Sequence, residues 1–151
     1  MQEATEMLAR FQVSYEVTVS SAHRAPHRTA ALAREAAARG IQVIIAGAGG
    51  AAHLAGVIAA ETALPVIGVP IDSSPLSGFD ALLAMVQMPR GVPVATVAVG
   101  KAGAANAGVL AAQIIAVGNP DVAARMKQYK AELAAKVECD AAALQRRLQE
   151  P

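Results

Sequence analysis

The sequence of 151 residues is long enough for one domain with its own hydrophobic core and too short for two ordinary domains. Its formal net charge is +1 and aromatic residues make up only 3%, so the basic patches and stacking side chains of a nucleic-acid-binding protein are not expected. A single cysteine, Cys139, leaves no internal disulfide and fits a reducing compartment, which favours a cytoplasmic protein.

Hydrophobic residues make up 54% of the sequence, yet no run reaches the length of a membrane span. The longest apolar runs, 41–50 and 64–71, are about half as long as a span requires and contain Gly or Pro. The first residues carry Glu3 and Glu6 and do not resemble a signal peptide. Abundant Ala raises the hydrophobic fraction, and surface buried between subunits would raise it too.

The hydrophobic period switches repeatedly along the chain, which predicts alternating helices and strands. Pro26 is placed to begin a helix that Gly40 ends, and Asn119 is placed to cap the last helix, ahead of Pro120. In chain order the predicted elements are a helix over 2–11, a strand over 13–19, a helix over 26–39, a strand over 42–46, a helix over 51–62, a strand over 64–69, a helix over 75–87, a strand over 94–99, a helix over 104–116 and a helix over 120–148.

Four strands that are unbroken apolar runs between helices predict an α/β domain with a parallel sheet covered on both faces. We expect a single domain over 1–151, with an α/β core over 1–118 and a helical tail over 119–151. Apolar residues recur at steps of three or four along the tail, and this stripe predicts a homo-oligomer. The stripe consists of Val122, Met126, Tyr129, Leu133 and Val137.

The loops after the strands hold the candidate functional residues, because ligands of parallel α/β folds bind at the carboxyl ends of the strands. His23 follows the first predicted strand, beside Ser21 and Arg24, and His53 follows the second, behind the glycine-rich turn 47–50. Such a turn lets a ligand approach the backbone, and an arginine offers donors suited to phosphate.

Each of these residues also has a plain structural interpretation. Glycine-rich turns serve tight strand-to-helix packing, Ser21 could be an ordinary turn residue, and His27 is expected to be a surface residue of a helix. The turn is not a dinucleotide fingerprint, because the final Gly and the later acidic residue are absent from the sequence. No acidic third ligand accompanies the histidines, and there is no Gly-x-Ser-x-Gly turn, so neither a metal site nor a serine hydrolase is expected.

Four segments resemble motifs of the N5-carboxyaminoimidazole ribonucleotide mutase family, and the resemblance extends to about Ala116. They are Ser21-Ala22-His23-Arg24-Ala25-Pro26, Gly47-Ala48-Gly49-Gly50-Ala51-Ala52-His53-Leu54, Gln87-Met88-Pro89-Arg90-Gly91-Val92-Pro93-Val94 and Gly100-Lys101-Ala102-Gly103-Ala104-Ala105-Asn106. The Ala-Ala-His version resembles the mutase class more than the class that uses carbon dioxide directly.

The resemblance implies a flavodoxin-like three-layer αβα domain, a homo-octamer, a ribonucleotide substrate, and a reaction without cofactor or metal. His23 matches the family's general acid/base, a role that suits a side chain whose unperturbed pKa lies near ~6.5. Ser21 and Arg24 match substrate-binding positions, with Arg24 on the phosphate. The loop around the base is matched by Ala48, Gly49, His53 and Leu54.

The sequence departs from the family at its beginning. Family members open with a strand and a Gly-Ser-x-Ser-Asp phosphate loop, whereas Met1 aligns inside the helix that follows this loop. Without that first, central strand, two strands of the sheet are expected to face a gap. Without the phosphate loop, the chain is expected to bind the ribonucleotide weakly. The alternatives to an active mutase are therefore a non-catalytic nucleotide-binding or assembly protein and, with less support, the direct carboxylase.

Overall fold

Three parallel strands form the central sheet of the computed structural model, which describes residues 1–149. They are β1 (Ile44–Ala48), β2 (Val66–Pro70) and β3 (Ala95–Thr96), and their order in the sheet is β1-β2-β3. Ile44 pairs with Val66 across the first ladder. All five residues of β2 are buried, as expected of an apolar strand with neighbours on both edges and helices on both faces.

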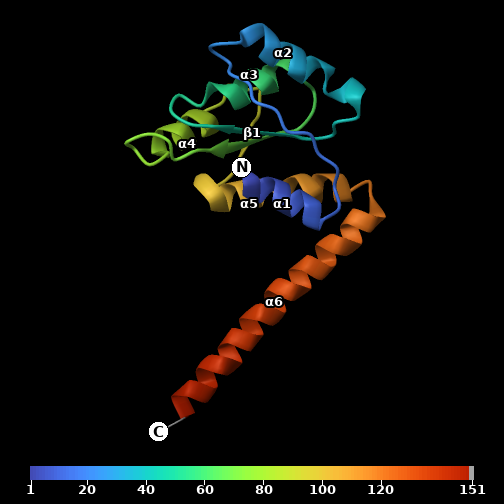
Figure 1. Ribbon diagram of the computed structural model, residues 1–151, viewed down its shortest axis with the longest axis vertical. Coiled ribbons are helices and arrows are strands. Elements are labelled where there is room, and N and C mark those ends of the chain that lie inside the picture. The colour runs from blue at the N-terminus through green and yellow to red at the C-terminus, as the bar shows by residue number, and fades with distance from the viewer. Residues whose placement is uncertain (150–151) are drawn as a thin grey trace.

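Helices cover both faces of this sheet, and one long helix projects away from it (Figure 1). One face carries α2 (Pro26–Glu35), α3 (His53–Glu61) and α4 (Phe79–Val86), with the short 3₁₀ helix η1 (Ala37–Arg39) after α2. The other face carries α1 (Gln2–Arg10) and α5 (Gly100–Ala116), and the projecting helix is α6 (Pro120–Gln149). These three layers confirm the predicted flavodoxin-like αβα architecture with its long C-terminal helix.

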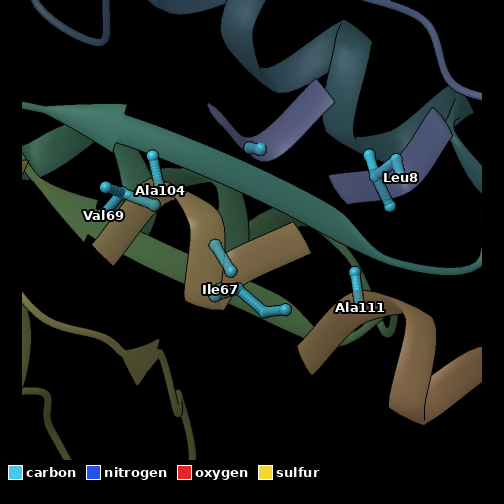
Figure 2. Packing of buried hydrophobic residues seen from close by; sticks show 7 residues of the cluster. Leu8, Ile67, Val69, Ala104 and Ala111 are labelled. Carbon is cyan, nitrogen blue, oxygen red and sulfur yellow. The ribbon is translucent and has the colours of Figure 1, made fainter. Parts of the chain in front are cut away.

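Small residues let α5 lie close to the sheet and to α1. Ile67 and Val69 of β2 pack beside Ala104 and Ala111 of α5, with Leu8 of α1 in the same cluster (Figure 2). A side chain at position 108 could not be accommodated, because its Cβ would lie 2.7 Å from a backbone oxygen of α1. This close packing holds α1 against α5 and completes the layer beneath β2.

The predicted helices and three of the predicted strands are confirmed, with shifted boundaries. The strand expected over 42–46 is β1 over 44–48, and the strand expected over 94–99 pairs over only two residues. The side chain of Asn119 accepts hydrogen bonds from the backbone N–H groups of Asp121 and Val122, so the predicted helix cap is confirmed.

The strand predicted over 13–19 is wrong. Residues 14–20 are extended, but within the described part of the chain their backbone makes no backbone hydrogen bond. Val17 and Val19 are 72% and 87% exposed, so the alternating pattern is present without a sheet partner. A strand requires a neighbour at hydrogen-bonding distance. This segment instead runs without a strand partner from the layer of α1 to α2, on the other side of the sheet (Figure 1).

An apolar groove lies between this segment and β1. It occupies the place where the sequence predicts a gap in the sheet. Its volume is about 880 Å³, and residues 13–20 and 41–47 both line it. The sheet of residues 1–149 consequently has three strands where the sequence predicted four.

The first turns of α6 pack on the domain, whereas the rest of the helix leaves it. Val122 and Met126 are buried beside Phe11, whose ring lies edge-on to Tyr129 at 5.3 Å between centroids. The last two residues of the predicted apolar stripe, Leu133 and Val137, are exposed. Leu144 and Leu148, farther along α6, are exposed as well.

Candidate active site

A pocket of about 280 Å³ opens at the carboxyl end of β1, between the glycine-rich turn and the loop that precedes α2. This is the edge at which ligands of parallel α/β folds bind. Its lining residues are Ser20, Ser21, Ala22, His23, Gly47, Ala48, Gly49, Ala51, Ala52, His53 and Leu54. Two chain segments far apart in sequence therefore build one site, as the motifs predicted.

The two histidines of the pocket contact each other directly. Nε2 of His23 lies 2.6 Å from Nδ1 of His53, and the two rings are perpendicular, with centroids 4.8 Å apart. A hydrogen bond between two ring nitrogens needs one proton between them, so one nitrogen donates and the other accepts. The pair therefore links the tautomer of each ring to that of the other, and a proton can pass between them.

The turn before α3 places His53. A Cβ at Gly49 would collide with the hydroxyl of Ser73 in the loop after β2, so a larger residue there would have to displace the Ser73 side chain. Ala52 adopts a left-handed backbone (φ 49°), a conformation that is rare for a residue with a side chain. The turn is closed by a hydrogen bond from the Ala52 N–H to the Gly49 carbonyl (3.1 Å), and His53 then begins the helix. Strained residues of this kind cluster at functional sites.

A buried threonine on α2 places the loop that carries His23. Thr29 is fully buried, and its hydroxyl donates to the Ala25 carbonyl (3.1 Å) while lying 2.7 Å from the Ser20 hydroxyl. Because Thr29 has one hydroxyl proton, the bond to Ser20 must be donated by Ser20. The hydroxyl of Ser21 accepts the Arg24 N–H, which tightens the same loop.

Six of the seven predicted site residues line the pocket, and one does not. His23, Ser21, His53 and the loop residues come together, whereas Arg24 is exposed and outside the lining, although it is the residue expected to hold phosphate. Sequence reasoning missed Ser20, which the unpaired segment 14–20 brings to the pocket. It also missed Ser73, whose side chain lies against Gly49. The small residue at position 49 is the signal in the sequence that reflects this contact.

Neither a metal cluster nor a membrane span is found in the described part of the chain. No group of three or more His, Cys, Asp or Glu side chains within residues 1–149 is placed to hold a metal ion. None of the helices described is long and apolar enough to cross a bilayer.

The architecture and the site define a flavodoxin-like α/β protein whose pocket is centred on a histidine pair. Comparison with known proteins identifies the family within this class: residues 1–136 match the family model described as AIR carboxylase. The chain is 58% identical to the N5-carboxyaminoimidazole ribonucleotide mutase of Vibrio cholerae over 132 residues, which cover 87% of this chain and 82% of that protein. It is 53% identical to the Thermotoga maritima enzyme of the same name over 137 residues, covering 91% and 79%.

Solved structures agree with this assignment. The crystal structure of Treponema denticola PurE superposes with a TM-score of 0.86 at 25% sequence identity, covering 95% of this chain and 88% of that one. The protein belongs to the AIR carboxylase family.

Proposed function

We propose that this protein is a mutase that moves the carboxyl group of N5-carboxyaminoimidazole ribonucleotide to carbon 4 of the same ring during purine synthesis. The observation that carries the proposal is the pair of His23 and His53 in one pocket, on the two motifs shared with the mutase class. Relatives that are 52–58% identical bear the name of this enzyme.

The proposed reaction needs one group that first gives and then takes a proton. Breaking the N5–carboxyl bond leaves its electron pair on N5, which takes a proton from His23 as carbon dioxide leaves. C4 then attacks the carbon dioxide, and His23 removes the C4 proton. The enzyme ends in its starting protonation state, so no external acid, base or oxidant is consumed.

His53 would keep the acid/base ready for both steps. The hydrogen bond of 2.6 Å fixes the ring of His23 and couples its tautomer to that of His53. Ser21, Ala48, Gly49 and Leu54, which line the pocket together with the two histidines, would contact the imidazole ring of the substrate. Enclosure would keep the released carbon dioxide beside C4 instead of losing it to solvent.

The test is to supply the purified protein with the N5-carboxylated ribonucleotide, labelled in its carboxyl carbon, and to follow the label by NMR. A mutase moves the label to C4 without dilution by unlabelled bicarbonate. Label that is lost to solvent and replaced by bicarbonate would instead indicate the direct carboxylase. Tight binding of the ribonucleotide without turnover would indicate a non-catalytic nucleotide-binding protein, and either result contradicts the proposal.

We further propose that the protein works in the cytoplasm as a homo-oligomer, an octamer like that implied by the family resemblance, with subunits joined along α6. Leu133, Val137, Leu144 and Leu148 are 45–70% exposed on a helix that leaves the domain (Figure 1). Apolar side chains at this spacing are typical of helices that bury a stripe against a partner. Light scattering on Leu133→Lys/Val137→Lys should give a smaller particle than the parent chain, and a monomeric parent chain would refute the proposal.

A further inference from the structure

Side chains at the end of α1 contact α6 where this helix leaves the domain (Figure 1). We infer that these contacts form a clasp that fixes the direction of α6 and thereby determines where its exposed apolar residues can meet a second copy of this chain. Its effect on a second copy depends on the proposed homo-oligomer, whereas its effect on the direction of α6 does not. The clasp consists of Arg10 and Phe11 at the end of α1 and of Arg125, Tyr129 and Glu132 on α6.

The turn that connects α5 to α6 does not by itself fix the direction of α6. Residues 117–119 separate the two helices. Val117 is 91% exposed, and a Cβ at Gly118 would have no other atom within 4 Å, so neither residue is packed against the domain. Side chains beyond this turn therefore have to hold α6 in place.

The buried contacts of α6 lie close to the turn. Val122 and Met126 are 2% and 9% exposed, and they belong to one cluster with Phe11 and Ala112 of α5. Nε of Arg125 donates to the Phe11 carbonyl at 2.7 Å. Because a helix rises about 1.5 Å per residue, Met126 is about 9 Å along α6 from its first residue. Contacts so near the turn hold the base of the helix and restrict its tilt weakly.

The outer contacts of the clasp act farther along the helix. The Tyr129 ring lies edge-on to Phe11, with 5.3 Å between the ring centroids, and the Arg10 guanidinium carbon lies 4.8 Å from the centroid of the same tyrosine ring. Arg10 also pairs with Glu132, whose other carboxylate oxygen accepts the side-chain amide of Gln128 at 3.0 Å. A ring that meets both a second ring and a guanidinium has a defined orientation, so these contacts restrict the tilt of α6.

The part of α6 beyond the clasp amplifies any change of tilt. Within the described chain no hydrogen bond or ion pair joins α6 to the domain beyond Glu132, and residues 130–142 are all exposed. Cys139 is about 28 Å along the helix from its first residue, so a rotation of about 20° at the turn would move it by about 10 Å. The exposed side chains of Leu133 and Val137 would move with it.

The single cysteine of the chain makes the direction of α6 measurable. A spin label on Cys139 is combined with a second label on α3, introduced as Ala60→Cys, and the distance between them is measured by double electron–electron resonance. Coexpression with an excess of the Cys139→Ser chain keeps labelled subunits apart in any assembly. We expect a narrow distance distribution that shifts or broadens by at least about 5 Å with Arg10→Ala, because the helix amplifies a small rotation. A broad distribution in the parent chain, or an unchanged one in the variant, would overturn the clasp.

Arg34→Ala is the matched control, because it removes an arginine from an ion pair with Glu61 that involves neither α1 nor α6. It should leave the distance distribution unchanged. An equal change in both variants would assign the effect to loss of positive charge and would contradict the clasp. Arg10→Lys keeps the charge but lacks the planar guanidinium, so it should restore only part of the parent distribution.

Light scattering separates the clasp from the proposed homo-oligomer. Arg10→Ala should lower the mass of the assembled particle at low micromolar concentration, although the exposed apolar residues of α6 are unchanged. A monomeric parent chain would refute the homo-oligomer, and the distance measurement would still decide whether the clasp exists. An altered direction of α6 with unchanged assembly would contradict the effect of the clasp on a second copy.

Discussion

The chain segments that precede the two histidines of the site differ in how they are held, and we call these segments the two supports. His53 follows β1, a strand held by a ladder of backbone pairs to β2, where Ile67 and Val69 are completely buried. His23 follows residues 13–20, which carry an equally β-branched pattern but expose Val17 and Val19. One half of the site is attached to the sheet. The other half follows residues 14–20, which are held by side-chain hydrogen bonds and make no backbone–backbone hydrogen bond within the described chain.

Side-chain bonds hold the second support at three places along its length. Glu16 pairs with Arg39, Arg28 donates to the Thr18 hydroxyl, and Ser20 bonds to Thr29. All three partners belong to the α2–η1 region, so the segment is fastened to the helix layer and not to the sheet. Similar sequences thus gain different stability from their neighbours, because β propensity reflects packing more than backbone preference.

The largest expected effect on stability comes from the hydrophobic core around β2, the strand that pairs with β1. Ile67→Ala should lower the free energy of unfolding by about 2–5 kcal/mol, because it leaves a cavity between β2 and α5. Val17→Ala removes a largely exposed side chain and should change it by no more than about 0.5 kcal/mol. Urea denaturation measures both. A similar cost at the two positions would show that residues 13–20 are packed in solution.

Activity should depend on His23 more than on any residue outside the pair. His23→Asn keeps a polar side chain but removes the titrating ring, so we expect turnover to fall by at least ~10²-fold with an unchanged circular dichroism spectrum. His27→Asn is the matched control, since His27 is exposed on α2 and is not part of the pocket lining. Normal turnover by folded His23→Asn would remove this residue from the mechanism.

The sequence predicts most of the frame and the meeting of the two histidines, for identifiable physical reasons. Apolar periodicity reports burial, which is why it places β2 and the helices correctly. The two histidines meet although residues 13–19 form no strand, because this segment still ends at the pocket beside the end of β1. The same periodicity misleads over 13–19, because alternation cannot reveal whether a neighbouring strand exists. The exposure of Arg24 is equally invisible, since residue type gives the chemistry of a side chain and not its direction.

A smaller effect on stability and turnover is expected from substitution of Thr29, which bonds to Ser20 at the end of residues 14–20. Thr29→Val keeps the shape of a fully buried side chain but leaves the Ser20 hydroxyl without its partner. The Ala25 carbonyl loses the hydroxyl and keeps only the backbone N–H of residue 29. We expect a loss of about 1–3 kcal/mol in the free energy of unfolding. Turnover should fall less than in His23→Asn, since the histidine itself remains. Thr29→Ser retains the hydroxyl and should recover most of the lost turnover, whereas equal turnover loss in both variants would assign the effect to packing.

The smallest effect compares an ion pair between two helices with one that joins η1 to residues 14–20. Arg34 and Glu61 join α2 to α3 at 2.7 Å, so both residues are fixed by helices. Arg39 and Glu16 are 2.9 Å apart, but Glu16 stands on the segment that lacks backbone hydrogen bonds. Exposed pairs are usually worth about 0.2–1 kcal/mol, and ordering a loosely held partner reduces that gain.

Double-mutant cycles with alanine at each pair should therefore give a coupling energy for Arg34 and Glu61 that exceeds the one for Arg39 and Glu16. Both couplings should weaken in 1 M salt, where the Debye length falls to about 3 Å. Equal couplings in the parent chain would mean that side-chain bonds alone hold the segment as firmly as helices hold their own residues, and the contrast between the two supports would disappear.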